Sequence, residues 1–411
     1  MHASSLFSDS ILLPVAAMSA PERPSATLAV RAGIDSDPTH GAVVPPLYLS
    51  STYSFAGYGE RRQYDYSRSG NPTRDGLGDA LASLEGGTKC IVTATGMAAV
   101  SLATAHLPAG SRVVAPRDCY GGSHRLFSAL ARTGRLVVDF VDPTDLGALR
   151  ESLQHRPSLV WLETPSNPLL RITDIRAVSD AAHAVGATVA VDNTFLSPLW
   201  QQPLQLGADL VVHSTTKYLN GHSDVVGGAV IAADPALGDE LAWWANCLGI
   251  TGSAFDSYLT LRGVRTLHAR LRVHEENATA IAAELVRQPA IGRVHYPGLA
   301  SHPGHALARA QQQGFGAMLS IELAAGAAAV PAFLDGLRCF SLAESLGGVE
   351  SLIAHPATMT HASMEPAARA RAGITDGLLR LSVGIESGED LIADLRAACA
   401  RAEAVPARAT A

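Results

Sequence analysis

The chain has 411 residues, of which 47% are hydrophobic and 17% charged, and its formal net charge is −7. This length suits one large domain with a smaller one, and an acidic chain without basic clusters argues against a nucleic-acid partner. No apolar run approaches the roughly 20 residues that cross a bilayer, so we expect no membrane segment. Five scattered cysteines without metal-like spacing predict free thiols, no metal site and a cytoplasmic location.

The N-terminal 75 residues are expected to lie outside the main fold. Residues 1–25 lack a positively charged start, and Asp9 interrupts their apolar part, so they do not resemble a signal peptide. We expect a disordered tail here, or translation that begins at Met18. Residues 26–75 are rich in Pro, Gly, Ser and Tyr and predict an extended arm. Its hydrophobic content indicates that the arm packs on a surface such as another subunit.

The rest of the chain predicts two α/β domains. Between residues 76 and 274, helical stretches separate seven apolar runs: KCIVTAT, SRVVAP, RLVVDFVD, SLVWLE, ATVAVDNT, DLVVHST and GGAVIAA. This alternation favours a mostly parallel seven-stranded sheet covered on both faces. In residues 275–411, the helical stretch NATAIAAELVRQ precedes the shorter runs RVHYPG, AMLSIELA and LLRLSVG, which predict a smaller C-terminal α/β domain.

Lys217 is the first candidate for chemistry. The chain has only two lysines, Lys89 and Lys217, and Lys217 follows the apolar run DLVVHST. Open parallel sheets bind ligands at the carboxyl ends of their strands. A buried lysine can lose its proton, and a neutral amine forms imines or acts as a base. A solvated surface lysine is the ordinary alternative, and an arginine-rich composition explains part of the scarcity.

Asp192 is the second candidate, because it ends the apolar run of ATVAVDNT. A carboxylate emerging from such a run is costly unless it meets a cation or hydrogen bonds. It suits a protonated ring nitrogen in a cofactor. A cap or turn for the following segment is the alternative.

A phosphate site is the third expectation. In IVTATGMAAVSLA, Gly96 lies in the turn before a helix that begins near Met97, and free N–H groups at such a helix start bind phosphate. Ser214 and Thr216 can supply hydroxyls to the same phosphate. The patterns GxGxxG, GxxxxGK[ST] and GxSxG are absent, which disfavours a dinucleotide fold, a P-loop and an α/β-hydrolase. Phosphate site, carboxylate and lysine together predict pyridoxal 5'-phosphate (PLP).

Several long motifs then identify a family. The chain resembles the Cys/Met-metabolism family of PLP enzymes from about residue 25 to 398. The motifs are VVPPLYLSSTY, YDYSRSGNPTRD, LEGGTKCIVTATGM, DCYGGSHRLF, ETPSNPLLRITDI, VDNTFLSP, STTKYLNGHSDVVGG, LAWWAN, AESLGGVESLIAHPATMTH and LLRLSVGIE. The resemblance implies a PLP-dependent transferase of fold type I. It also implies a homotetramer, a dimer of dimers in which subunits share active sites.

The resemblance also implies which residues bind the cofactor. Lys217 matches the lysine that holds PLP covalently, and Asp192 matches the partner of the pyridine nitrogen. Tyr120, in DCYGG, matches the residue that stacks on the ring, which places its phenol near the reacting amine. The further cofactor contacts implied are Thr194, Gly96, Met97, Ser214 and Thr216, with Tyr66 and Arg68 reaching across the dimer to the neighbour's phosphate.

The substrate site follows from the same resemblance. Arg380, in LLRLSVG, is similar to the arginine that grips the substrate α-carboxylate, which a planar guanidinium does bidentately. Ser345 and Asn167 match positions that line the same pocket. Asp65 and Arg125 match positions near the distal end of the substrate.

The activity implied is γ-replacement, catalysed through Lys217, Tyr120 and Asp192. An O-acylated homoserine, succinyl or acetyl, would react with L-cysteine to give L-cystathionine and the free acid, a step of methionine biosynthesis. Glu344 matches a glutamate typical of members that act at Cγ. The alternatives are γ-elimination of cystathionine, as in a γ-lyase, and a sulfhydrylase that uses sulfide. A non-catalytic protein on this fold would be expected to lack Lys217 or Asp192.

Overall fold

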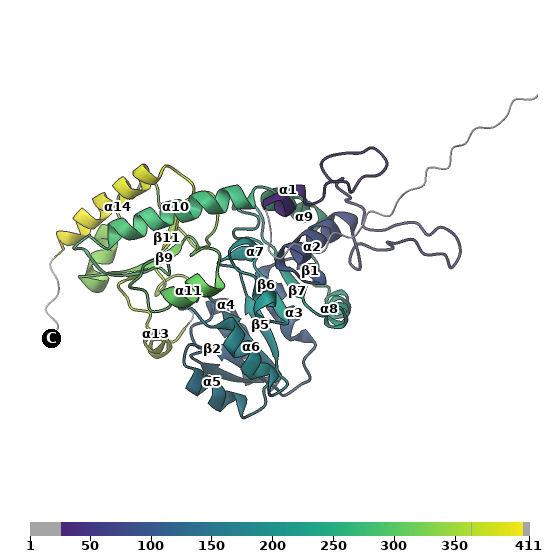
Figure 1. Ribbon diagram of the computed structural model, residues 1–411, viewed down its shortest axis with the longest axis horizontal. Coiled ribbons are helices and arrows are strands. Elements are labelled where there is room, and N and C mark those ends of the chain that lie inside the picture. The colour runs from purple at the N-terminus through teal and green to yellow at the C-terminus, as the bar shows by residue number, and fades with distance from the viewer. Residues whose placement is uncertain (1–25, 363, 406–411) are drawn as a thin grey trace, which may run out of the picture.

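The computed structural model describes residues 26–362 and 364–405, so the predicted tail at residues 1–25 lies outside the described residues. The larger part of the molecule is built around a seven-stranded sheet (Figure 1). Its strands are β1 (Lys89–Thr93), β2 (Ser111–Pro116), β3 (Leu136–Val141), β4 (Leu159–Glu163), β5 (Thr188–Asp192), β6 (Leu210–His213) and β7 (Gly228–Ala232). They lie in the order β1-β7-β6-β5-β4-β2-β3. Neighbours run parallel except β7, which is antiparallel to β1 and β6. The expected mostly parallel seven-stranded sheet is confirmed.

Both faces of this sheet are covered by helices. One face packs on α3 (Gly96–Ala105), α4 (Gly121–Arg132) and α8 (Pro235–Leu248), and the other on α5 (Leu146–Leu153) and α6 (Ile175–His183). In β4, Trp161 belongs to the first core and Leu162 to the second, because successive strand residues point to opposite faces. A strand buried on both sides therefore appears in the sequence as an unbroken apolar run.

The C-terminal part contains a second sheet of five strands. In sheet order they are β10 (Ser341–Leu342), β11 (Leu352–Ala354), β12 (Leu378–Ser382), β9 (Met318–Leu323) and β8 (Ile291–His295). All pairs are antiparallel except β10 with β11. The helices α10 (Leu267–Leu285) and α14 (Gly388–Glu403) lie side by side along this part (Figure 1). The expected smaller α/β unit is confirmed, and its runs at β8, β9 and β12 were predicted as strands.

Helix α10 connects the two sheets. Its Arg270 donates from Nη1 to the carbonyl oxygen of Tyr218, the residue after Lys217, at 2.8 Å. One turn further on, His274 Nδ1 lies 2.6 Å from the carbonyl oxygen of Val383, just after β12. The predicted division at residues 274 and 275 falls inside this helix and stays a prediction.

The segment predicted as an arm, residues 26–75, includes loops that extend to the right in Figure 1. It begins with α1 (Ala26–Arg31) and continues as irregular chain to Asn71, whose side chain caps α2 (Pro72–Glu85). The remaining helices are α7 (Ser197–Trp200), η1 (Pro203–Leu206), α9 (Ala254–Val264), α11 (His305–Gln311), η2 (Gly326–Ala329), α12 (Val330–Leu334) and α13 (Pro366–Ala372). Large apolar side chains of the arm are exposed, among them Val43, Leu49, Phe55 and Tyr58.

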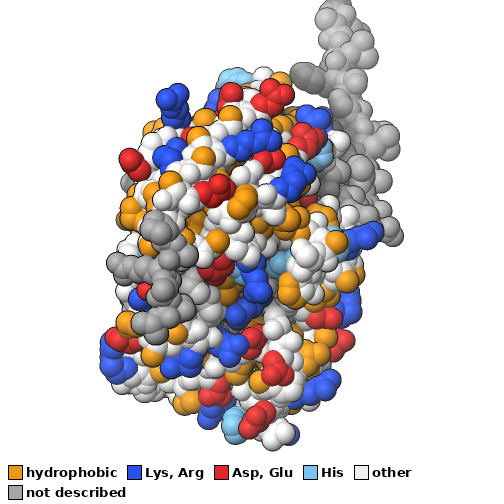
Figure 2. Space-filling model, turned by 90° about the vertical axis from the view of Figure 1, so that its left-hand side faces the viewer, with side chains coloured by type: hydrophobic (Ala, Val, Ile, Leu, Met, Phe, Trp, Pro, Cys, Tyr) orange, Lys and Arg blue, Asp and Glu red, His pale blue; other side chains and the backbone are white. Residues whose placement is uncertain are grey.

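The surface carries charges of both signs. On the face shown in Figure 2, Lys and Arg side chains alternate with Asp and Glu over both parts of the molecule. Within the described residues, no helix combines the length and the apolar character needed to cross a membrane. The five cysteines are free thiols.

Candidate active site

A cavity of about 660 Å³ opens at the carboxyl ends of the large sheet's parallel strands. Most residues expected at the site line it: Gly96, Met97, Tyr120, Arg125, Asn167, Asp192, Thr194, Ser214, Thr216, Lys217, Glu344, Ser345 and Arg380. They come from the turns after β1, β2, β4, β5 and β6, and from the smaller part of the chain. The fold therefore brings together side chains that lie up to 284 residues apart, from Gly96 to Arg380.

Lys217 lies in the turn after β6, and its side chain points toward Ser345 in the wall of the cavity. Its Nζ donates a hydrogen bond to Ser345 Oγ at 2.7 Å. The pKa of the amine is lowered to about 8, mainly by burial and then by the nearby Arg380, while Glu344 opposes the shift. Ser345 has a φ of 86°, a conformation that costs a residue other than glycine about 1–3 kcal/mol and marks functional positions.

Two carboxylates lie beside each other at the ends of β4 and β5. Glu163 is the register partner of Asp192, and both line the cavity. Asp192 Oδ1 accepts the N–H of Thr194 at 2.9 Å, and burial raises the pKa of both acids. A cation placed next to them would favour their ionised forms, which is what a protonated ring nitrogen provides.

Glu163 was missed by the sequence interpretation. It accepts the backbone N–H of Tyr120 at 2.7 Å and the indole N–H of Trp161 at 3.1 Å. It therefore holds the start of α4 against the sheet. The signal was present in the sequence, because SLVWLE ends in a carboxylate just as ATVAVD does.

The start of α3 forms a cradle with Ser214. A Cβ on Gly96 would lie 2.8 Å from the Ser214 Cβ, so only glycine permits this close approach. The N–H groups of Gly96 and Met97 precede the helix's own hydrogen-bond ladder and carry the positive end of the helix dipole. The Ser214 N–H itself is fixed by Thr194 Oγ1 at 2.9 Å. This arrangement suits a phosphate group.

Arg380 is a buried cation whose hydrogen-bond partners among the described residues are uncharged, with the Glu344 carboxylate nearby. Only 3% of the residue is exposed, and its guanidinium donates to Asn167 Oδ1 at 3.1 Å and to the Ser345 carbonyl oxygen at 2.8 Å. Its Nε is buried without a hydrogen-bond partner among the described residues. Burial lowers its pKa to about 10, so it remains charged at neutral pH. Such a group is suited to binding a carboxylate.

Tyr120 closes one side of the cavity at the start of α4. A Cβ on Gly122 would lie 2.5 Å from its Cε1, so the ring packs directly on that glycine. Burial raises the pKa of the phenol, with Glu344 adding to the shift, and the group is therefore neutral at neutral pH. Other lining residues that no prediction named are Val100, Pro165, Phe195, Val226, Leu346, Met359, Thr360 and Ala362.

Three expected residues lie outside this cavity, in the arm. Arg68 donates to the Asn246 carbonyl oxygen at 2.8 Å and lies over the Tyr66 ring, 5.7 Å from its centroid. Asp65 accepts the Ser69 hydroxyl at 2.9 Å. Their expected role concerns a neighbouring subunit and stays a prediction.

The residues that line the cavity match the chemical groups of one cofactor, PLP. PLP needs an anion site for its phosphate, a carboxylate for its ring nitrogen and a lysine amine for its aldehyde. A mostly parallel sheet flanked by helices, together with a phosphate site, a carboxylate and a lysine, defines a PLP-dependent enzyme of fold type I. The chain belongs to the Cys/Met metabolism PLP-dependent enzymes, whose family model matches residues 26–400.

Individual relatives resemble the chain over almost its full length. The cystathionine γ-synthase of Escherichia coli (strain K12) is 58% identical over 374 residues, 91% of this chain and 97% of that protein. The cystathionine γ-lyase of Dictyostelium discoideum is 45% identical over 370 residues, 90% and 96% of the two chains. A solved cystathionine γ-synthase of Xanthomonas oryzae pv. oryzae in complex with cystathionine is 64% identical, with a TM-score of 0.91 over 92% of this chain and 98% of that one.

Proposed function

We propose that the chain catalyses γ-replacement, in which O-succinylhomoserine or O-acetylhomoserine reacts with L-cysteine to give L-cystathionine. The Cγ–O bond of the homoserine ester breaks and a Cγ–S bond forms. The thiol proton balances the released succinate or acetate. The reaction is the transsulfuration step of methionine biosynthesis, and free thiols fit a cytoplasmic location.

The likeness to synthases carries the choice among the family's reactions. The synthases of E. coli and X. oryzae are 58% and 64% identical to the chain, whereas the D. discoideum γ-lyase is 45% identical. The cavity by itself suits both reactions, because synthase and lyase chemistry both require a base that acts at neighbouring carbons of one amino acid. Any assay must therefore also measure the γ-lyase and the sulfhydrylase activities.

The site residues have distinct roles in this proposal. Bound PLP supplies an electron sink that stabilises negative charge at the substrate α-carbon. Lys217 would hold the cofactor covalently, and its neutral amine would be the base that takes protons from Cα and Cβ, with the protonated amine returning them. Asp192 would keep the ring nitrogen protonated, Tyr120 would stack on the ring, and Arg380 would bind the α-carboxylate with help from Ser345.

The phosphate and the distal end of the substrate engage further residues. Gly96, Met97, Ser214 and Thr216 hold the phosphate, and Thr194 orients Asp192 through its backbone N–H. Arg125, on α4 at the cavity wall, offers a cation to an anionic acyl group or to the cysteine carboxylate.

We further propose that two subunits complete each active site and that two such dimers form the tetramer. Tyr66 and Arg68 would reach the partner's phosphate, and Asp65 its distal substrate site. The exposed apolar side chains of the arm continue onto α8 and α9 with Trp243, Leu248 and Phe255. Such clusters mark association surfaces. We expect sedimentation to show a tetramer. We also expect that mixing Lys217→Ala subunits with Tyr66→Ala subunits restores activity.

The decisive test is a substrate comparison on purified holoenzyme. O-succinylhomoserine or O-acetylhomoserine with L-cysteine should give cystathionine, and cystathionine alone should be cleaved slowly. Lys217→Ala, the matched control, should give no product in either mixture. Rapid release of 2-oxobutanoate from cystathionine would instead establish the γ-lyase reaction, and homocysteine formed only with sulfide would establish the sulfhydrylase reaction. The ester that reacts faster identifies the acyl donor.

A further inference from the structure

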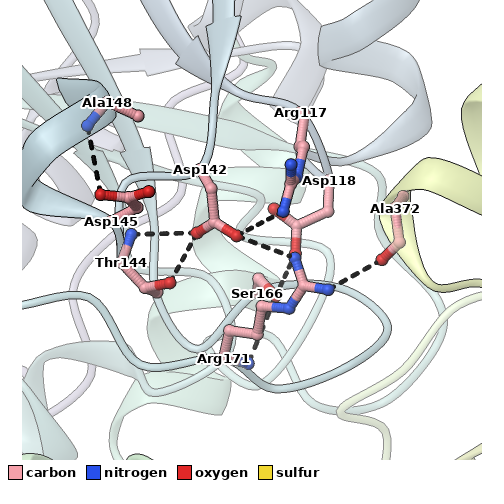
Figure 3. Close-up of polar contacts among 9 residues, drawn as sticks. All are labelled: Arg117, Asp118, Asp142, Thr144, Asp145, Ala148, Ser166, Arg171 and Ala372. Atoms are coloured by element: carbon pink, nitrogen blue, oxygen red, sulfur yellow. Dashed lines mark hydrogen bonds and ion pairs between the residues drawn. The ribbon is translucent and has the colours of Figure 1, made fainter. Parts of the chain in front are cut away.

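Arg171 joins the two parts of the chain beneath the active site. It lies in the loop between β4 and α6, and Figure 3 shows its guanidinium between two carboxylates. Nη1 is 3.4 Å from Asp118 Oδ2 and 3.5 Å from Asp142 Oδ2. Nη2 donates to the carbonyl oxygen of Ala372, the last residue of α13, at 3.0 Å. One side chain therefore contacts the ends of two large-sheet strands and a helix of the smaller part.

The carboxylate of Asp118 is directly connected to the active-site wall. Only 2% of Asp118 is exposed, and its Oδ2 also accepts the Ser166 hydroxyl at 2.8 Å. Asp118 precedes Tyr120 by two residues. Ser166 is next to Asn167, whose side-chain oxygen accepts a hydrogen bond from Arg380. Removing Arg171 would leave the buried Asp118 carboxylate without the cation that pairs with it, which is strongly unfavourable.

The loop that carries Asn167 is also fixed from the other side. Leu169 packs in an apolar cluster with Met364, Ala372, Ile374 and Leu378 of the smaller part. Ser320 Oγ, on β9, donates to the Pro168 carbonyl oxygen at 2.7 Å. The loop therefore lies between the two sheets. The Arg171 guanidinium makes polar contacts to both the large sheet and the smaller part.

We propose that Arg171 is a positioning residue that holds Tyr120 and Asn167 at a fixed distance from Arg380, and thereby sets the affinity for the α-carboxylate of the amino-acid substrate. The inference rests on the proposed function only in taking the substrate to be an amino acid. It does not depend on which bond the enzyme makes or breaks. Arg171 acts through its neighbours and does not line the cavity.

The test compares Arg171→Ala with Arg112→Ala. Arg112 is a close match, because its side chain is 30% exposed against 28% for Arg171, and its ion pair with Asp139 lies within the large sheet. The dissociation constant of glycine, which carries no leaving group, is measured on holoenzyme from the change in cofactor absorption. The melting temperature is measured in parallel. We expect Arg171→Ala to weaken glycine binding about tenfold or more and Arg112→Ala to change it less than twofold.

A second variant keeps the proposal testable if Arg171→Ala does not fold. Ser166→Ala removes only the hydroxyl between Asp118 and the loop, and we expect it to weaken glycine binding about threefold. Equal glycine affinity in wild type, Ser166→Ala and any folded Arg171→Ala protein would overturn the proposal, whatever happens to the melting temperature. Because glycine undergoes no replacement reaction, an enzyme that forms no cystathionine still gives this measurement, so the two proposals fail separately.

Discussion

Lys217 should react as an unusually acidic amine, and its reactivity can be followed by changing the pH of protein freed of PLP. With a pKa of about 8 in place of the usual 10.5 of a lysine, about 9% of the amine is neutral at pH 7, against about 0.03% for an ordinary lysine. The structure therefore predicts about 300-fold more neutral amine at this pH. The neutral fraction rises with pH and levels off above about 8. Glu344→Gln removes the charge that opposes the shift and should move the midpoint lower.

The assay is amine-directed labelling followed by mass spectrometry of peptides. The chain has only two lysines, so Lys89, which forms a surface ion pair with Asp239, reports the reagent in the same sample. The rate of labelling at Lys217 is plotted against pH for the wild type and for Glu344→Gln. A midpoint above pH 10, or a midpoint that rises in Glu344→Gln, would refute the electrostatic reasoning.

Three further predictions concern single substitutions. Gly96→Ala places a Cβ against Ser214 and should weaken PLP binding to the apo-protein about tenfold, measured by cofactor titration, since overpacking typically costs about 1–3 kcal/mol; unchanged affinity would contradict the cradle. Arg380→Ala should raise the KM for the homoserine ester about 10- to 100-fold, because hydrogen bonds to charged groups contribute about 1.5–3 kcal/mol; a loss confined to kcat would argue against carboxylate binding. Glu163→Gln should lower the free energy of unfolding by about 1–3 kcal/mol in a denaturant titration, because the amide cannot accept from both the Tyr120 N–H and the Trp161 indole. Equal stability would show that these hydrogen bonds are dispensable.

The large sheet was predictable because its strands are buried on both faces. Runs such as SLVWLE have an unbroken apolar centre and are followed by turn residues. In the smaller part the pattern fails for physical reasons. β10 and β11 have two and three residues, too few for a periodic signal. The first half of α10, before Asn277, was not predicted, because it buries Arg270 and His274, whose hydrogen bonds replace the expected apolar stripe.

The site divides in the same way. Lys217 and Asp192 were found because strand ends meet at one edge of a parallel sheet. Arg380 and Ser345 lie in the smaller part, where nothing local in the sequence marks them, and only the family resemblance identified them. Glu163 was overlooked although it follows the rule that found Asp192. The proposed role of Tyr66 involves a second subunit, and it too was assigned from the family resemblance.

The bonds from Arg270 to the residue after Lys217, and from His274 to the end of β12, limit how this enzyme can be recombined. A chimera that takes its C-terminal portion from a relative would have a helix α10 whose contacts to the two parts of the molecule come from different parents. Substrate preference should therefore be transplanted with the whole helix and the turn beneath it, and exchanging the C-terminal portion alone should give protein that folds poorly or leaves its reactive amine misplaced.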